Sequence, residues 1–270
     1  MTAFNPLQRA AFVVSALMLL LAAIGPMLVP YDPVVPDPVA RLLPPSTEHW
    51  LGTDHLGRDV FSRVLAGARL SIGLAVLVVL ISAAVGLVIG LAAGACGRWA
   101  DATLMRLTDA FFAFPELIAA LAVAGVLGGG GVEILFALAV VGWMRYARLV
   151  RGMTLATAAS DHVALARLSG VAPLRIACDH LTPPVLPAMV VMMTAHLARA
   201  ILAISGLGFL GFGAAPPTPE WGVILLEARV YILSAPVYAI LPGLPIVISV
   251  LAFNLAGDAL RDRIGSVVPE

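Results

Sequence analysis

The chain has 270 residues, of which 61% are hydrophobic and only 12% charged, and its formal net charge is zero. A soluble domain of this size would need far more polar surface, and several apolar runs approach the ~20 residues that cross a bilayer as a helix. The composition therefore predicts an all-α integral membrane protein. The balanced charge gives no reason to expect a nucleic-acid partner.

All 16 basic residues are arginine, so the sequence contains no lysine. A phosphate-binding P-loop requires a lysine, as does Schiff-base chemistry. We therefore expect no cofactor on this chain, and any ATP and Mg²⁺ would have to be held by partner subunits. The two cysteines, Cys96 and Cys178, do not form a disulfide framework.

Six apolar spans follow one another along the chain, and they predict six transmembrane helices. The first span is too long for a cleaved signal core, so we expect a retained helix. The segment between the first two spans is polar and rich in proline, and its end, from about Asp59, predicts an amphipathic helix on the membrane surface. The predicted spans are 10–29, 70–95, 108–127, 132–150, 185–207 and 237–255.

Two of these spans carry local signals. Gly86, Gly90 and Gly94 recur every four residues on one face of the second span, which favours close packing of a neighbouring helix over a ligand site. Pro115 interrupts the third span and predicts a kink there.

The arginines also predict the orientation. With the N-terminus inside, ten arginines fall in inner segments and five in outer segments, which favours cytoplasmic termini. The predicted organisation is an N-terminal helix and extracytoplasmic segment (1–69), a core of five transmembrane helices (70–258) with a cytoplasmic loop (151–184), and a cytoplasmic tail (259–270).

That loop contains the stretch "DHVALARLSGVAPLRIACDHLTPP", Asp161 to Pro184. Ser160 or Asp161 is suited to begin a helix and Gly170 to end it in a left-handed conformation. Either the helix is an ordinary amphipathic surface helix, or it docks in the groove of a partner. In the second case small residues would allow close approach and polar ones would make contacts; these are Ala164, Ala166, His162 and Arg167.

The same stretch resembles the loop of ABC-importer permeases, in which Glu-Ala-Ala is followed by a glycine and later by an apolar residue and a proline. Ala164, Leu165 and Ala166 take the place of the triplet, so the acidic residue is replaced. "HWLGTDHLGRDVFSRVLAGARLSIG", "GFLGFGAAPPTPEWG" and "LAFNLAGDALRD" are similar to motifs of the C-type permeases of the oligopeptide/dipeptide/nickel family. The nickel branch is the nearest, because peptide-type members place a Glu where this chain has Ile204.

The resemblance implies a type I ABC importer permease fold in the bacterial cytoplasmic (inner) membrane. It also implies a second permease subunit, two cytoplasmic ATPases that bind ATP and Mg²⁺, and an extracytoplasmic substrate-binding protein. The expected substrate is nickel or a nickel chelate, with dipeptides or oligopeptides as the alternative. The residues that would couple to the ATPases are Asp161, His162, Ala164, Ala166, Arg167, Gly170 and Pro183.

Ionisable side chains inside the spans are costly and are candidates for the translocation pathway. These are Glu116, His196 and Arg199. His196 is either a metal ligand or a hydrogen-bonded residue of the helix bundle. Arg199 would repel a bare divalent cation and suits the carboxylates of a chelate.

Two other classes of protein remain as comparisons. A self-contained secondary transporter usually shows two related halves, and no convincing internal repeat is present. No "HExxH", "GxSxG" or paired-cysteine motif points to a membrane enzyme. The sequence therefore favours a permease subunit without an ATPase site of its own.

Overall fold

The computed structural model describes residues 5–265, and every regular element in that range is helical. The prediction of an all-α protein is confirmed. The helices are α1 (Pro6–Ile24), α2 (Val60–Ala95), α3 (Arg98–Phe112), α4 (Glu116–Leu127), α5 (Gly131–Ala158), α6 (Asp161–Leu168), α7 (Pro173–Ile176), α8 (Thr182–Leu207), α9 (Trp221–Ala228), α10 (Pro236–Ile240) and α11 (Leu244–Gly265). Short 3₁₀ or π turns lie between them, at η1 (Gly25–Met27), η2 (Pro38–Ala40), η3 (Ala177–Leu181), η4 (Gly208–Phe212), η5 (Arg229–Tyr231) and η6 (Leu241–Gly243).

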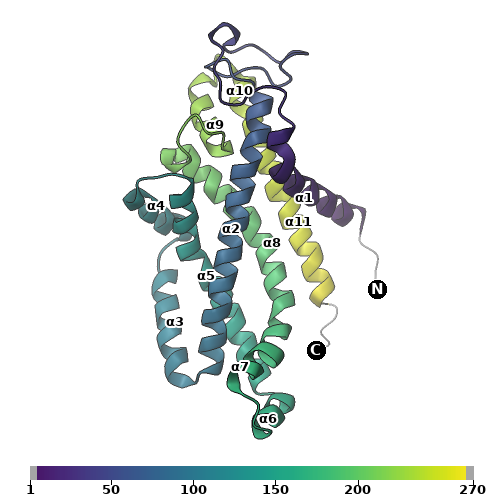
Figure 1. Cartoon of the computed structure of the whole chain (residues 1–270), viewed down its shortest axis with the longest axis vertical. Coiled ribbons are helices and arrows are strands. Elements are labelled where there is room, and N and C mark those ends of the chain that lie inside the picture. Colours follow the sequence, from purple (N-terminus) through teal and green to yellow (C-terminus); the bar gives the residue numbers. More distant parts are fainter. Residues whose placement is uncertain (1–4, 266–270) are drawn as a thin grey trace.

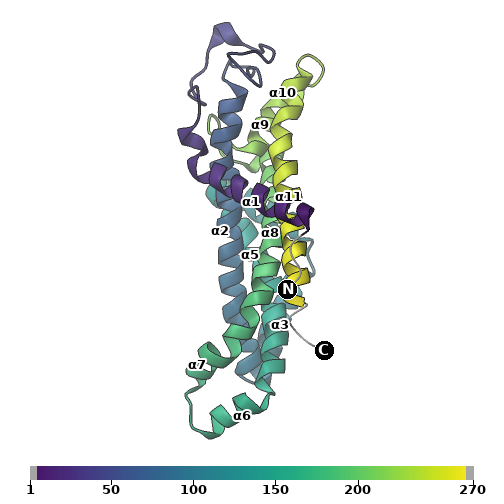
Figure 2. The ribbon, with the colours of Figure 1, turned by 90° about the vertical axis from the view of Figure 1, so that its right-hand side faces the viewer.

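The molecule is an elongated bundle whose long helices α2, α5 and α8 run along its long axis (Figure 1). The Pro-rich segment 28–59 lies at one end with α9 and α10, and α6 and α7 lie at the other. Helix α1 runs obliquely across α2 and α11 (Figure 2). The core is made of apolar side chains from α2, α5 and α8, such as Val78, Leu138 and Ile201.

Helices α2 and α5 pack closely because glycines line the contact. A Cβ at Gly90 would lie 2.5 Å from the Cβ of Val150, and one at Gly94 would lie 2.6 Å from the Cβ of Thr154. Gly86 approaches Tyr146 in the same way. The prediction that these glycines serve helix packing is confirmed.

Four described helical segments are long and apolar enough to cross a membrane: Pro6–Met27, Val60–Ala95, Pro173–Phe212 and Pro236–Ile264. The bent pair α3 and α4 would make a fifth. Length and composition therefore identify four or five membrane spans in the described residues, and not the six that the sequence predicted. The remaining predicted span corresponds to α5, which has 28 residues but carries Arg145, Arg148 and Arg151.

Three predicted details are wrong. Val60 already begins the continuous helix α2, so no separate surface helix precedes it. Pro115 does not kink one helix but caps α4, and α3 and α4 meet at 86°, because proline disfavours a helical conformation at the preceding residue. The spans on either side of the predicted loop are longer than expected, since α5 continues to Ala158 and helix resumes at Pro173.

Candidate functional site

A cavity of about 330 Å³ opens between α4, α5 and α8. Glu116, the first residue of α4, and Arg199 of α8 both line it, and the rest of its wall is apolar. The sharp turn at Pro115 makes this possible, because it starts a new helix and places the Glu116 carboxylate at that start. The structure thus brings together two of the three residues predicted for the translocation pathway.

Arg145 of α5 is a member of this site that the sequence did not single out. Its guanidinium lies 2.7 Å from a carboxylate oxygen of Glu116. Arg145 and Arg199 also line a second cavity, of about 460 Å³, next to Met192 and Arg261. An arginine in the middle of an otherwise apolar run is the signal that would have identified it.

The charges at the cavity do not cancel. Glu116 is engaged by Arg145, and Arg199 makes no ion pair or hydrogen bond with any residue in the range 5–265. Two guanidinium groups and one carboxylate give the site a net charge of +1. Such a site attracts an anionic group, which Arg can bind with two parallel hydrogen bonds.

His196, the third predicted residue, lies elsewhere. Its side chain is only 4% exposed, and Nδ1 is 3.0 Å from the hydroxyl oxygen of Tyr146 on α5. It also lies close to Gly142, where α5 approaches α8. His196 lines neither of the two cavities, so it is not part of the wall that Glu116 and Arg199 form.

The predicted short helix is present at one end of the molecule, as α6 (Figure 1). Val163 is fully buried against Ile176 and Leu181, which fixes α6 to the start of the α7–α8 helix. Gly170 follows with a φ of +75°, so its predicted left-handed conformation is confirmed. Ser160 precedes the helix without capping it, since its hydroxyl donates a hydrogen bond to the carbonyl oxygen of Thr157.

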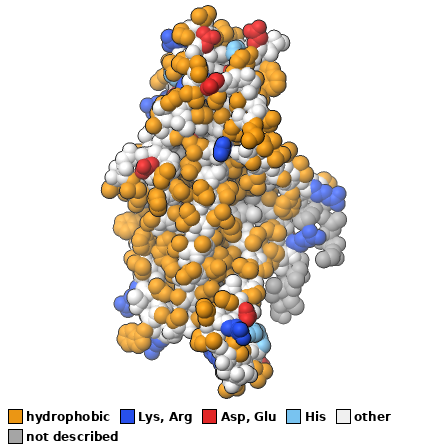
Figure 3. Space-filling view, in the orientation of Figure 1, with side chains coloured by type: hydrophobic (Ala, Val, Ile, Leu, Met, Phe, Trp, Pro, Cys, Tyr) orange, Lys and Arg blue, Asp and Glu red, His pale blue; other side chains and the backbone are white. Residues whose placement is uncertain are grey.

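The outer face of α6 is exposed and mixed in character. Leu165 is 63% and Leu168 85% exposed. Charged and histidine side chains gather at this end, whereas hydrophobic ones cover the middle of the molecule (Figure 3). Of the predicted coupling residues, Ala166 is partly buried and the others are exposed, namely Asp161, His162, Ala164, Arg167, Gly170 and Pro183.

The opposite end of the bundle is held together by buried ion pairs. Arg58 contacts Asp54 at 2.6 Å and Glu227 at 2.9 Å, and Arg63 contacts Glu227 at 2.8 Å. Arg58 and Arg63 are almost fully buried. These contacts fasten the Pro-rich segment to α2 and α9.

A carboxylate that the sequence did not single out anchors α9. Glu220 is 1% exposed and accepts hydrogen bonds from the backbone N–H groups of Gly222 and Val223 and from the hydroxyl of Ser71. It therefore caps α9 and joins it to α2.

One group of side chains in the described range has the composition of a metal site. Ligand atoms of Asp54, His55 and Glu227 lie within 4.8 Å of one another. Both carboxylates are already engaged by Arg58 and Arg63, and His55 Nδ1 lies 3.3 Å from the Tyr238 hydroxyl. Burial lowers the pKa of His55 from its ordinary value. The group is therefore explained as part of the ion-pair network.

Comparison with known proteins identifies the family. Residues 86–266 match the family described as "Binding-protein-dependent transport system inner membrane component". The chain is 43% identical to the nickel transport system permease protein NikC of Escherichia coli K12, over 95% of this chain and 92% of that protein. It is 41% identical to the glutathione transport system permease protein GsiD of Pectobacterium atrosepticum, over 95% and 87% respectively.

A solved structure shares the fold. The MetNI methionine ABC transporter, in an inward-facing conformation, matches with a TM-score of 0.58 at 20% sequence identity, over 76% of this chain and 96% of that one. The chain thus has the type I ABC importer permease fold, and as a permease subunit it is a transport component and not itself an enzyme. The chain belongs to the inner-membrane permeases of the binding-protein-dependent ABC importers, in the group that includes the nickel and glutathione permeases.

Proposed function

We propose that this permease, with a second permease subunit, forms the passage of an importer for a nickel chelate. The cavity at Glu116 and Arg199 is the proposed contact point for substrate. The observation that carries the substrate proposal is the uncompensated positive charge of Arg199 at this cavity. A bare divalent cation would be repelled there, whereas the carboxylates of a chelate complement it. The 43% identity with a nickel permease supports nickel as the metal in this chelate.

A glutathione-type peptide is the second candidate. Its carboxylates would suit the same cation, and the identity with a glutathione permease is nearly as high. Uptake by the reconstituted importer decides between them, with radioactive nickel supplied alone or with a carboxylate chelator such as citrate, and with labelled glutathione. We expect the chelate to be taken up fastest. Uptake of glutathione without uptake of nickel in either form would overturn the nickel proposal.

The role of Arg199 is tested by Arg199→Gln, for which we expect at least tenfold slower uptake of the chelate. Arg148→Gln is the matched control, because Arg148 lies on α5, is paired with Asp109 at 2.5 Å and lines neither cavity. Equal uptake by both variants, with normal assembly, would remove Arg199 from the pathway.

His196 is proposed as a second, metal-binding contact. Tyr146 fixes the ring through Nδ1, so Nε2 would be the metal-binding atom. Because the ring is buried here, α5 and α8 would have to move apart during transport for a metal to reach it. His196→Ala should then reduce nickel uptake more than Tyr146→Phe, which breaks the same hydrogen bond. Equal effects of the two substitutions would mean that His196 serves only the bundle.

We further propose that α6 receives the movement of the partner ATPases, which bind ATP and Mg²⁺, and that both termini are cytoplasmic. The exposed leucines of α6 offer an apolar face for a groove, and Asp161 or Arg167 would supply the polar contact in place of the acid replaced by Ala164. The burial of Val163 supports this role, because it joins α6 rigidly to the α7–α8 helix. At the opposite end, the Pro-rich segment would face the substrate-binding protein.

A further inference from the structure

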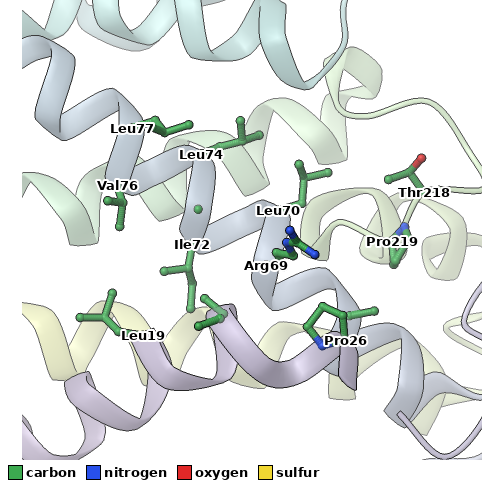
Figure 4. A pocket seen from close by; sticks show the side chains of 14 residues that line it. Leu19, Pro26, Arg69, Leu70, Ile72, Leu74, Val76, Leu77, Thr218 and Pro219 are labelled. Carbon is green, nitrogen blue, oxygen red and sulfur yellow. The ribbon is translucent and has the colours of Figure 1, made fainter. Parts of the chain in front are cut away.

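A further cavity is larger than either of the two described above. It is a groove of about 730 Å³ between α1 and α2, closed at one end by Thr218 and Pro219 (Figure 4). It shares no residue with the cavity at Glu116 and Arg199. The proposed transport function therefore leaves this groove unexplained.

The groove exists because small residues face each other where α1 crosses α2 obliquely (Figures 2 and 4). Ala22 and Ala23 line it from α1, and Ala66 and Gly73 from α2. A Cβ built on Gly73 would meet no atom within 4 Å, so this glycine faces open space. The larger side chains around the rim, such as Leu19 and Leu77, are apolar and exposed.

One cationic side chain lies at the groove, that of Arg69 (Figure 4). It is exposed, and within the described part of the chain it makes no ion pair or hydrogen bond. The position of Arg69 along α2 indicates how deep this side chain lies in the membrane. Residues 70–95 contain no charged side chain, and at ~1.5 Å per residue they extend beyond the ~30 Å hydrocarbon core. Arg69 therefore lies at the headgroup level, on the side of the Pro-rich segment 28–59.

We propose that the groove binds a phospholipid of the surrounding bilayer, with an acyl chain against α1 and α2 and the phosphate on Arg69. A groove that faces hydrocarbon is not filled by water, and an acyl chain matches its apolar lining. A phosphate at the headgroup level complements the unpaired guanidinium. The lipid would also support α1, which has the smallest buried share (17%) of the four candidate spans.

The first test is photo-crosslinking of the complete importer in vesicles of phosphatidylethanolamine and phosphatidylglycerol that contain a phospholipid with a photoreactive acyl chain. We expect labelled peptides from 19–26 and 66–77. Gly73→Leu should reduce that labelling at least fivefold, because the new side chain fills the open space. Gly152→Leu is the matched control, since a Cβ at Gly152 would also meet no atom within 4 Å, but this glycine lies on α5, away from the groove.

Arg69→Gln tests the phosphate contact separately. We expect it to reduce labelling at least threefold without filling the groove. A second readout is thermal unfolding in detergent with and without added phospholipid, in which lipid should stabilise the parent protein more than Gly73→Leu. Equal labelling of the parent and Gly73→Leu, or cross-links from this groove to the second permease subunit in place of lipid, would overturn the proposal.

Discussion

Replacing Gly90 by alanine should destabilise the protein, although alanine is the better helix former. The new Cβ would lie 2.5 Å from the Cβ of Val150 and 2.7 Å from the carbonyl oxygen of Ala147, whereas carbon atoms in contact are ~3.5–4.0 Å apart. Helices α2 and α5 would have to separate by roughly 1 Å. The clashing atoms are the Val150 Cβ and a backbone carbonyl oxygen, which no side-chain rotation can move away. The cost therefore falls in the upper part of the ~1–3 kcal/mol range of overpacking, at ~2–3 kcal/mol, and the helix propensity of alanine returns ~1 kcal/mol. The expected net loss is about 1–2 kcal/mol.

Gly152→Ala on α5 is the matched control, because Gly152 is exposed and lies outside the groove at Gly73. Its Cβ would meet nothing, so the same chemical change should stabilise the protein by ~0.5–1 kcal/mol. The assay is thermal unfolding of the purified permease complex in one detergent, where the Gly90→Ala midpoint should fall by roughly 2–8 °C. A Gly90→Ala protein as stable as the Gly152→Ala protein would refute the close packing of α2 against α5.

Three further outcomes follow from the site and its surroundings. Gly206 lies on the wall of the cavity at Glu116 and Arg199, and a Cβ there meets no atom, so Gly206→Leu should fill part of this cavity. Substrate uptake should fall at least tenfold with assembly unchanged. Normal uptake would exclude this cavity from the pathway. Gly170→Val strains a backbone with φ of +75°; ATP hydrolysis should continue while uptake falls, and unchanged uptake in membrane vesicles would count against the docking role of α6. Burial lowers the pKa of His55 below its ordinary value of 6.5. As the pH falls, the unfolded chain therefore binds a proton at His55 before the folded protein does. The midpoint temperature of thermal unfolding should thus decrease as the pH falls below ~6.5. His55→Asn should show a smaller decrease, and an unchanged pH profile would contradict this.

The sequence predicts those parts of the structure that depend on residues close together along the chain. The apolar runs predict the class of protein, and the four-residue spacing of Gly86, Gly90 and Gly94 predicts a close helix contact. The end of helix α6 at Gly170 also follows from a local signal, because the left-handed preference of glycine acts within a few residues.

The site itself depends on contacts between distant segments. Arg145 meets Glu116 only because Pro115 turns the chain by 86° and does not merely kink it. Arg58 and Glu227 are 169 residues apart, and nothing in either neighbourhood indicates their ion pair. His196 and Arg199 are three residues apart, yet one is buried against Tyr146 while the other lines the cavities.

The most direct test of the central claim is nickel uptake by the complete importer in proteoliposomes. Its components are both permease subunits, the ATPases and the binding protein, with radioactive nickel chelate outside the vesicles. We predict uptake only when ATP reaches the ATPases and the binding protein is present, and none from an ion gradient. Uptake by this chain alone, driven by an ion gradient without ATP, would contradict the account.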